Sequence, residues 1–201
     1  MSGISGAFGL FGGTIGAIDG WLCALEATSD VPDPSDYFSG HYQCHGLNVQ
    51  VVCDANLQII HLSMAGVGQT NNAWAFCTLT KLQEWLSSLE DYFIVGDNAY
   101  PLLKSLLIPF SGADSHDNYN DSYNFHLSQL RIRVEICFGR LTTKWQIFRS
   151  KLLLAHGTPK NCQIVRVGAA LHNYVINADN LNFRDIADND LDTLKVEPTV
   201  E

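Results

Sequence analysis

The stretch FHLSQLRIRVEICFGRLTTKWQIF, residues 125–148, repeats its apolar side chains at the spacing of an α-helix. At about 100° per residue, one stripe collects Leu127, Leu130, Val134, Cys137, Phe138, Leu141 and Trp145. Such a stripe predicts an amphipathic helix packed on a core. Ile132 and Ile136 point away from it and predict a second packing surface. Glu135 lies in a polar row along one border of the stripe, where buried surface meets a cleft.

Glu135 is the one acid between residues 122 and 178, a segment that holds eight Lys or Arg residues. Two interpretations of this acid are open. In the first it pairs with Arg131, one helical turn earlier, and contributes about 0.3–0.5 kcal/mol on an exposed face. In the second it binds a cation together with acids from elsewhere in the chain. The opposite border of the stripe holds Arg133, Arg140 and Lys144.

Length and composition predict one soluble globular domain. Chains of about 150 residues already bury some two-thirds of their surface, and this chain has 201. Its hydrophobic fraction is 46% and its mean hydropathy is +0.02. No apolar run approaches the ~20 residues that span a bilayer, and residues 1–14 lack the positive charge of a signal peptide. We therefore expect no membrane partner.

The six cysteines are scattered along the chain and form no CxxC pair. Because several occupy strand-like or helix-like core positions, they predict reduced thiols in an intracellular protein. His41, Cys44 and His45 lie close in sequence, but no second ligand pair follows at the spacing of a zinc finger. A zinc site is therefore disfavoured.

The net charge of −9 argues against a nucleic-acid partner, but the distribution of charge does not. Residues 131–166 hold eight bases and one acid, whereas the segments on both sides carry an excess of acids. A concentrated basic stripe can contact phosphates even in an acidic protein. The alternative is a solvated helix face that pairs with the protein's own acids, and charge alone does not decide between the two.

Periodicity and turn chemistry divide the rest of the chain into elements. Apolar and polar residues alternate over residues 47–54, which indicates a half-buried strand. The continuous apolar run at residues 92–97 is typical of a central strand buried on both faces. The predicted order is strands at 14–22, 47–54 and 57–64, a helix at 72–89 capped by Asn71 or Asn72, a strand at 92–97 with a short helix after it, a loop at 111–124, and helices at 125–148 and 158–177. This order predicts an α/β fold, a ribonuclease-H-like mixed β-sheet flanked by helices.

Acids stand near the ends of two predicted strands, Asp19 in the first and Asp97 in the fourth. Carboxylates at adjacent strand ends, joined by one from a helix, form an oxygen-rich site for Mg²⁺ or Mn²⁺. Two such ions activate water and stabilise the leaving oxygen in phosphodiester cleavage. Each acid also has a simpler interpretation, because Asp19 before Gly20 fits a turn and Asp97 fits a cap.

Five blocks follow one another between Gly16 and Asn177: GAIDG at 16–20, NVQVVCD at 48–54, VGDNAYP at 95–101, RVEICFGRL at 133–141 and LHN at 171–173. They resemble the signature blocks of PIF/Harbinger-type DDE transposases and their domesticated nuclease relatives. The resemblance implies a nuclear, ribonuclease-H-like catalytic domain that cuts and joins DNA with divalent metal. It also implies that Asp19, Asp97 and Glu135 are the catalytic triad and the metal ligands. Candidate DNA contacts are Arg131, Arg133, Arg140 and Lys144.

The chain departs from the family pattern in the block GQTNNAWAF, residues 68–76, where Asn72 stands in place of an expected acid. An Asn can offer a carbonyl oxygen but no negative charge, so we expect a weakened metal position. We expect an N-terminal remnant at 1–15, the endonuclease domain at 16–177 and a disordered acidic tail at 178–201. A helical DNA-binding region normally precedes such a domain, so a separate DNA-binding partner protein is expected.

These features favour a metal-dependent DNA endonuclease domain in a truncated or partly degenerate copy. The alternative is a catalytically inactive, transposase-derived domain that binds protein or DNA.

Overall fold

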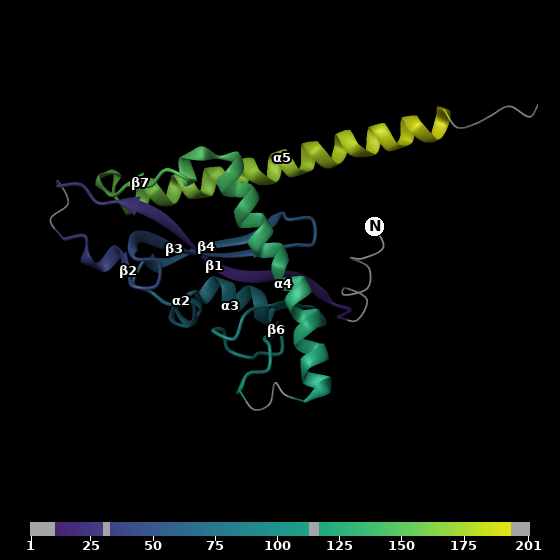
Figure 1. The fold of residues 1–201 in the computed structure, drawn as a ribbon, viewed down its shortest axis with the longest axis horizontal. Helices are drawn as coiled ribbons and strands as arrows, with labels where there is room; N and C mark the ends of the chain where they lie inside the picture. The colour runs from purple at the N-terminus through teal and green to yellow at the C-terminus, as the bar shows by residue number, and fades with distance from the viewer. Residues whose placement is uncertain (1–10, 30–32, 113–116, 194–201) are drawn as a thin grey trace, which may run out of the picture.

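The computed structural model describes residues 11–29, 33–112 and 117–193, with no side-chain description at residue 65 or from residue 180 onward. Most of the expected N-terminal remnant, residues 1–10, and the end of the expected tail, residues 194–201, lie outside the described residues. Figure 1 shows a sheet with helices on both faces.

Seven strands of the described chain form one mixed sheet built around β1, Thr14–Glu26. β3 (Cys44–Cys53) pairs antiparallel with β1, and β4 (Ile59–Val67) pairs antiparallel with β3. On the other side of β1, β5 (Phe93–Val95) is parallel, and β6 (Leu106–Leu107) is parallel to β5. The short strands β2 (Phe38–Ser39) and β7 (Leu152–Leu153) extend the sheet beside β3 and β1. The predicted α/β fold with a mixed sheet is confirmed.

The sheet separates two apolar clusters, and β3 contributes to both. Val49, Val51 and Cys53 belong to the cluster under the two long helices. Val52 belongs to the cluster under the shorter helices. The prediction of a half-buried strand at 47–54 is therefore wrong, because helices cover both faces of β3. Its polar residues Asn48 and Gln50 are buried as well.

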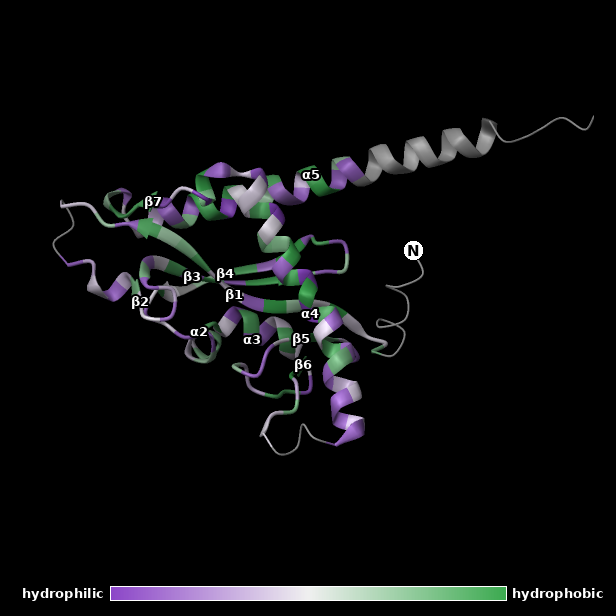
Figure 2. Cartoon of the chain, viewed as in Figure 1, coloured by the Kyte–Doolittle hydropathy of each residue, from purple (hydrophilic) through white to green (hydrophobic). Residues whose placement is uncertain are grey.

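The helix α4, Asn118–Lys144, packs on the first cluster with the predicted stripe inward. Its buried residues are Leu127, Leu130, Val134, Cys137 and Leu141. It begins within the segment predicted as a loop and ends four residues early, with a separate 3₁₀ turn at Gln146–Phe148. Figure 2 shows that the beginning of α4 is hydrophilic, which explains why apolar periodicity did not reveal it.

Two helices, α2 (Asn72–Thr78) and α3 (Thr80–Ser87), stand where one was predicted at 72–89. The chain breaks at Leu79, whose ψ of 74° is not helical. Asn71 caps α2 as predicted, because its side chain accepts a hydrogen bond from the main-chain N–H of Trp74 at 2.8 Å. Phe76 and Leu82 anchor the two helices in the second cluster.

The last helix, α5, runs over Thr158–Thr193 and thus continues beyond the expected end at Asn177. A 3₁₀ turn, Leu154–His156, precedes it. In Figure 1, α5 lies along the same side of the sheet as α4. Within the part of the chain that the structure describes, no helix is both long and apolar enough to cross a membrane.

Candidate active site

Asp19 lies in the interior of β1, where the sequence predicted a strand end. β1 continues to Glu26 because its antiparallel pairing with β3 extends as far as Leu25. The parallel pairing with β5 ends much earlier, at Ala17 opposite Val95. From there until β7 joins at Leu25, β1 is paired with β3 alone, so the edge of β1 that faces away from β3 has no strand partner at Asp19.

Asp97 follows β5 by two residues, as Asp19 follows Ala17 by two. Since Ala17 and Val95 are paired in parallel, both acids lie just past the same registered pair. They line one cavity of about 450 Å³. The side chain of Asp97 also accepts a hydrogen bond from the N–H of Ala99 at 3.0 Å.

The environment of Asp19 disfavours the ionised form of its carboxyl group. Its pKa rises from 3.8 to about 6, mainly because the carboxyl is buried. The negative charges of Asp97 and Glu135 raise the pKa further. The N–H of Gly20, which donates to Asp19 Oδ1 at 2.7 Å, and the charge of Arg131 lower it. The three predicted acids and Arg131 therefore interact electrostatically at Asp19.

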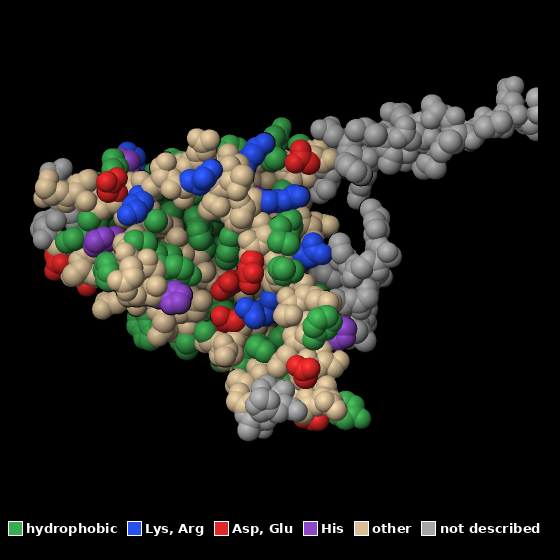
Figure 3. Space-filling view, viewed as in Figure 1, with side chains coloured by type: hydrophobic (Ala, Val, Ile, Leu, Met, Phe, Trp, Pro, Cys, Tyr) green, Lys and Arg blue, Asp and Glu red, His purple; other side chains and the backbone are tan. Residues whose placement is uncertain are grey.

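Glu135 occupies an exposed position on α4 and is not part of the cavity wall. Figure 3 shows acidic side chains beside a basic one near the middle of the face of the molecule that it draws. Among the described residues, no group of three or more His, Cys, Asp or Glu is arranged to hold a metal ion. The donor chemistry still fits a divalent cation, because the partly buried Asp19 carboxylate meets two like charges and would gain from a positive one.

Two tyrosines lie near the acids, and one of them lines the cavity. Tyr42 lines it, and the pKa of Tyr42 is raised first by burial and then by the charges of Asp19 and Asp97. Tyr100, which is 2% exposed, has its pKa raised by burial and by the same two acids. Both phenols are therefore held neutral next to the acids.

Beneath the cavity lies a network of amides that sequence reasoning missed. Gln50, which is fully buried, donates from Nε2 to Asn48 Oδ1 at 2.8 Å and to Asn72 Oδ1 at 3.0 Å. Tyr100 donates to Gln50 Oε1 at 2.5 Å. The alternation of apolar and polar residues along β3 predicted that these polar side chains face solvent. Their partner Asn72 comes from α2, so the hydrogen bonds are visible only in the folded structure.

Asn72 also packs against Gly20, the residue after Asp19. A Cβ on residue 20 would overlap the Asn72 amide, so this close approach requires glycine. The expectation that Asn72 offers a carbonyl oxygen to a metal is not supported by these contacts. That oxygen accepts hydrogen bonds from Gln50 and, at 3.4 Å, from Asn48.

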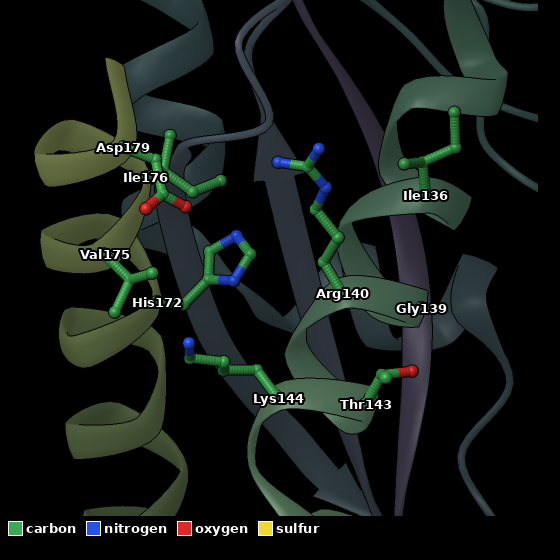
Figure 4. Close-up of a pocket in the computed structure, with 9 residues that line it drawn as sticks. All are labelled: Ile136, Gly139, Arg140, Thr143, Lys144, His172, Val175, Ile176 and Asp179. Carbon is green, nitrogen blue, oxygen red and sulfur yellow. The ribbon is translucent and has the colours of Figure 1, made fainter. Parts of the chain in front are cut away.

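The basic residues predicted to contact phosphate do not form one surface. Arg131 acts on Asp19, whereas Arg133 is half-buried with a buried Nε that has no hydrogen-bond partner. Arg140 and Lys144 line a separate cavity of about 650 Å³ between α4 and α5. Figure 4 shows both extending toward α5, with His172 between the two helices.

The LHN block at residues 171–173 has a structural role. Asn173 exchanges two hydrogen bonds of 2.8 Å with the main chain of Ile59, which ties α5 to β4. His172 is 3% exposed and lies 2.9 Å from the main-chain oxygen of Leu57 and 3.5 Å from Cys137 Sγ. These two side chains hold α5 and α4 against the turn between β3 and β4.

A mixed sheet in this order, with acids beside its adjacent parallel strands and a third acid on a covering helix, is the arrangement of a ribonuclease-H-like fold. The chain belongs to the DDE superfamily endonucleases, whose family model matches residues 18–173. The predicted superfamily is thus confirmed, while the narrower PIF/Harbinger assignment stays a prediction. No curated protein matches the chain, and no solved structure does.

Proposed function

We propose that this domain is a divalent-metal-dependent DNA endonuclease of the PIF/Harbinger type. The proposal has Asp19, Asp97 and Glu135 as catalytic residues and as ligands of Mg²⁺ or Mn²⁺. The observation that carries it is the register of β1 and β5, which sets Asp19 and Asp97 beside one cavity. The effect of Glu135 on the pKa of Asp19 supports the third position.

Bound metal would supply the activation of water and the neutralisation of charge on the leaving oxygen. The chain's own residues have distinct tasks. Asp19 and Asp97 bind the cation from the two strands, and burial of Asp19 strengthens that attraction by excluding water. Arg131 offsets part of the negative charge at Asp19. Tyr42 closes one side of the cavity.

DNA would approach along the basic residues of α4. Arg131, Arg133, Arg140 and Lys144 are the proposed phosphate contacts. Arg131 lowers the pKa of Asp19 by its charge, whereas Arg140 and Lys144 line the cavity beside α5. The DNA backbone would therefore be held at separate points. A DNA substrate also implies residence in the nucleus, and we include a separate DNA-binding partner protein in the proposal.

Cleavage of supercoiled plasmid by the purified domain in Mn²⁺ or Mg²⁺ tests this function. Asp97→Ala should slow nicking at least about a hundredfold, since a lost metal ligand removes several kcal/mol of transition-state stabilisation. Glu84→Gln is the matched control, because it removes an exposed acid on α3, away from the cavity. An Asp97→Ala protein that cuts as fast as the parent would show that the triad is wrongly assigned.

A second candidate function is that of a catalytically inactive domain that binds protein or DNA. Two observations favour it: Asn72 carries no charge at the expected acidic position, and the described residues contain no preassembled group of three ligands. Calorimetric titration with Mn²⁺ separates the candidates. Absence of binding in the millimolar range would rule out the nuclease and leave the binding domain.

A further inference from the structure

The hydrogen bonds of the amide network under the cavity have a fixed donor-to-acceptor direction. A main-chain carbonyl at one end of the network sets this direction. The oxygen of Thr70 can only accept hydrogen bonds, and it accepts one from Asn48 Nδ2 at 2.8 Å. The NH₂ group of Asn48 therefore faces Thr70, so its oxygen is the atom that meets Gln50. Gln50 donates to that oxygen from Nε2 at 2.8 Å.

The same direction continues to Asn72. Gln50 Nε2 donates to Asn72 Oδ1 at 3.0 Å, and Asn48 Nδ2 lies 3.4 Å from the same oxygen. Gln50 Oε1 in turn accepts from Tyr100 at 2.5 Å, so both ends of the Gln50 amide have partners of the right kind. Rotating the amide of Asn72 by 180° would bring its NH₂ group against two donors.

Burial makes that reversal costly. Gln50 is fully buried, Tyr100 is 2% exposed and Asn48 is 7% exposed. Water therefore cannot reach Gln50 to replace a mismatched partner, and an unsatisfied buried donor destabilises strongly. The orientation of the Asn72 amide follows from its partners: Oδ1 faces the network, and Nδ2 is left for the other side.

That other side is the acidic cavity. Asn72 lines it together with Asp19 and Asp97, and packs on Gly20 directly after Asp19. The Nδ2 group of Asn72 can donate a hydrogen bond to a negatively charged oxygen of a bound ligand. Neither of the two carboxylates can do so, because an ionised carboxylate only accepts. Asn side chains are regular donors to the phosphate oxygens of nucleic acids.

We propose that Asn72 is a positioning residue that donates a hydrogen bond from Nδ2 to a phosphate oxygen of DNA in the acidic cavity, and is not a metal ligand. The identity of the ligand rests on the proposed function, whereas the direction of the amide rests on the network alone. Asn72 then holds the phosphate while the carboxylates hold the cation.

The test measures affinity for a short fluorescent DNA duplex by anisotropy in EDTA, with no metal present. Asn72→Asp keeps the acceptor for Gln50 but replaces the donor with an oxygen. Asn71→Asp is the matched control, because Asn71 lines the same cavity and an Asp caps α2 equally well. Both variants add one negative charge, so the donor is the difference between them. We expect Asn72→Asp to weaken binding about tenfold more than Asn71→Asp.

A third variant tests the metal directly. Asn72→Ala should bind DNA more weakly than the parent but take up Mn²⁺ with unchanged affinity in calorimetry without DNA. Circular dichroism melts establish that each variant is folded. Equal loss of DNA affinity in the two Asp variants, or weakened Mn²⁺ binding by Asn72→Ala, would overturn the inference. A parent that binds DNA but never cuts it would contradict only the endonuclease, and a parent that binds no DNA, either in EDTA or with Mn²⁺ present, would contradict both.

Discussion

Asp19 holds its proton more tightly in the folded protein than in the unfolded chain, because burial and two neighbouring acids oppose its charge. Its pKa of about 6 lies above the ordinary 3.8, so folding takes up a proton between these pH values. Stability is therefore lost as pH rises through this window, and the full penalty is present above about pH 6. The rise in pKa corresponds to about 3 kcal/mol at most.

Asp19→Asn should consequently stabilise the metal-free protein at pH 8 and leave its stability at pH 4 nearly unchanged. The Asn oxygen still accepts the hydrogen bond from Gly20, so little else is altered. Urea denaturation at pH 4, 6 and 8 measures the difference. Parallel stability profiles for the variant and the parent would refute the assignment of the pKa. Added Mn²⁺ should stabilise the parent and not the variant, since ligands stabilise the state that binds them.

The acids could be predicted from the sequence, and their polar neighbours could not. Asp19 and Asp97 follow apolar runs, which mark strands that meet in the sheet. Asn48 and Gln50 alternate with apolar residues, a pattern that normally indicates a solvent-facing side. They are buried because Asn72 and Tyr100 arrive from distant segments to satisfy their hydrogen bonds. No local pattern contains that information.

At the scale of elements, two glycines in helices provide a matched pair. Gly168 of α5 faces Phe148, and a Cβ there would overlap the aromatic ring. Phe148 is held in place by an edge-on contact with Trp21, at 5.3 Å between ring centroids. Gly139 of α4 is open, since nothing lies within 4 Å of a Cβ added there.

We expect opposite signs from the same substitution at these two sites. Gly139→Ala should stabilise the protein by up to about 1 kcal/mol, because alanine has the higher helix propensity. Gly168→Ala should destabilise it by about 1–3 kcal/mol, because the overpacked ring must shift. Thermal and urea denaturation measure both values. Stabilisation by Gly168→Ala would mean that α5 does not pack closely on the Gln146–Phe148 turn.

The sequence predicted the buried faces of helices better than it predicted where helices begin and end. The apolar stripe of α4 identified its buried residues, because periodicity reports the face that packs on a core. The stripe did not extend to the hydrophilic first turns, which begin at Asn118. The break at Leu79 between α2 and α3 was also missed, since no Gly or Pro marks it.

At the scale of the whole molecule, the basic segment at residues 131–166 does not become a single basic stripe. Arg131 and Arg140 are nine residues apart, which places them on opposite sides of a helix with 3.6 residues per turn. Arg131 lowers the pKa of Asp19 by its charge, and Arg140 lines the cavity beside α5. Charge clustering along the chain predicted a phosphate-binding segment, but the helix divides it between two surfaces.

The salt dependence of DNA binding tests whether the cavity between α4 and α5 contacts the backbone. Each phosphate neutralised contributes about −0.9 to the slope of log K against log salt, so Arg140→Ala with Lys144→Ala should make the slope shallower by nearly two. Arg149→Ala with Lys151→Ala is the matched control, because it removes the same charge from exposed positions of the same basic segment. That control should leave the slope nearly unchanged. Equal changes in the two double variants would mean that only long-range charge matters here, and that the backbone is held on the Arg131 side of α4.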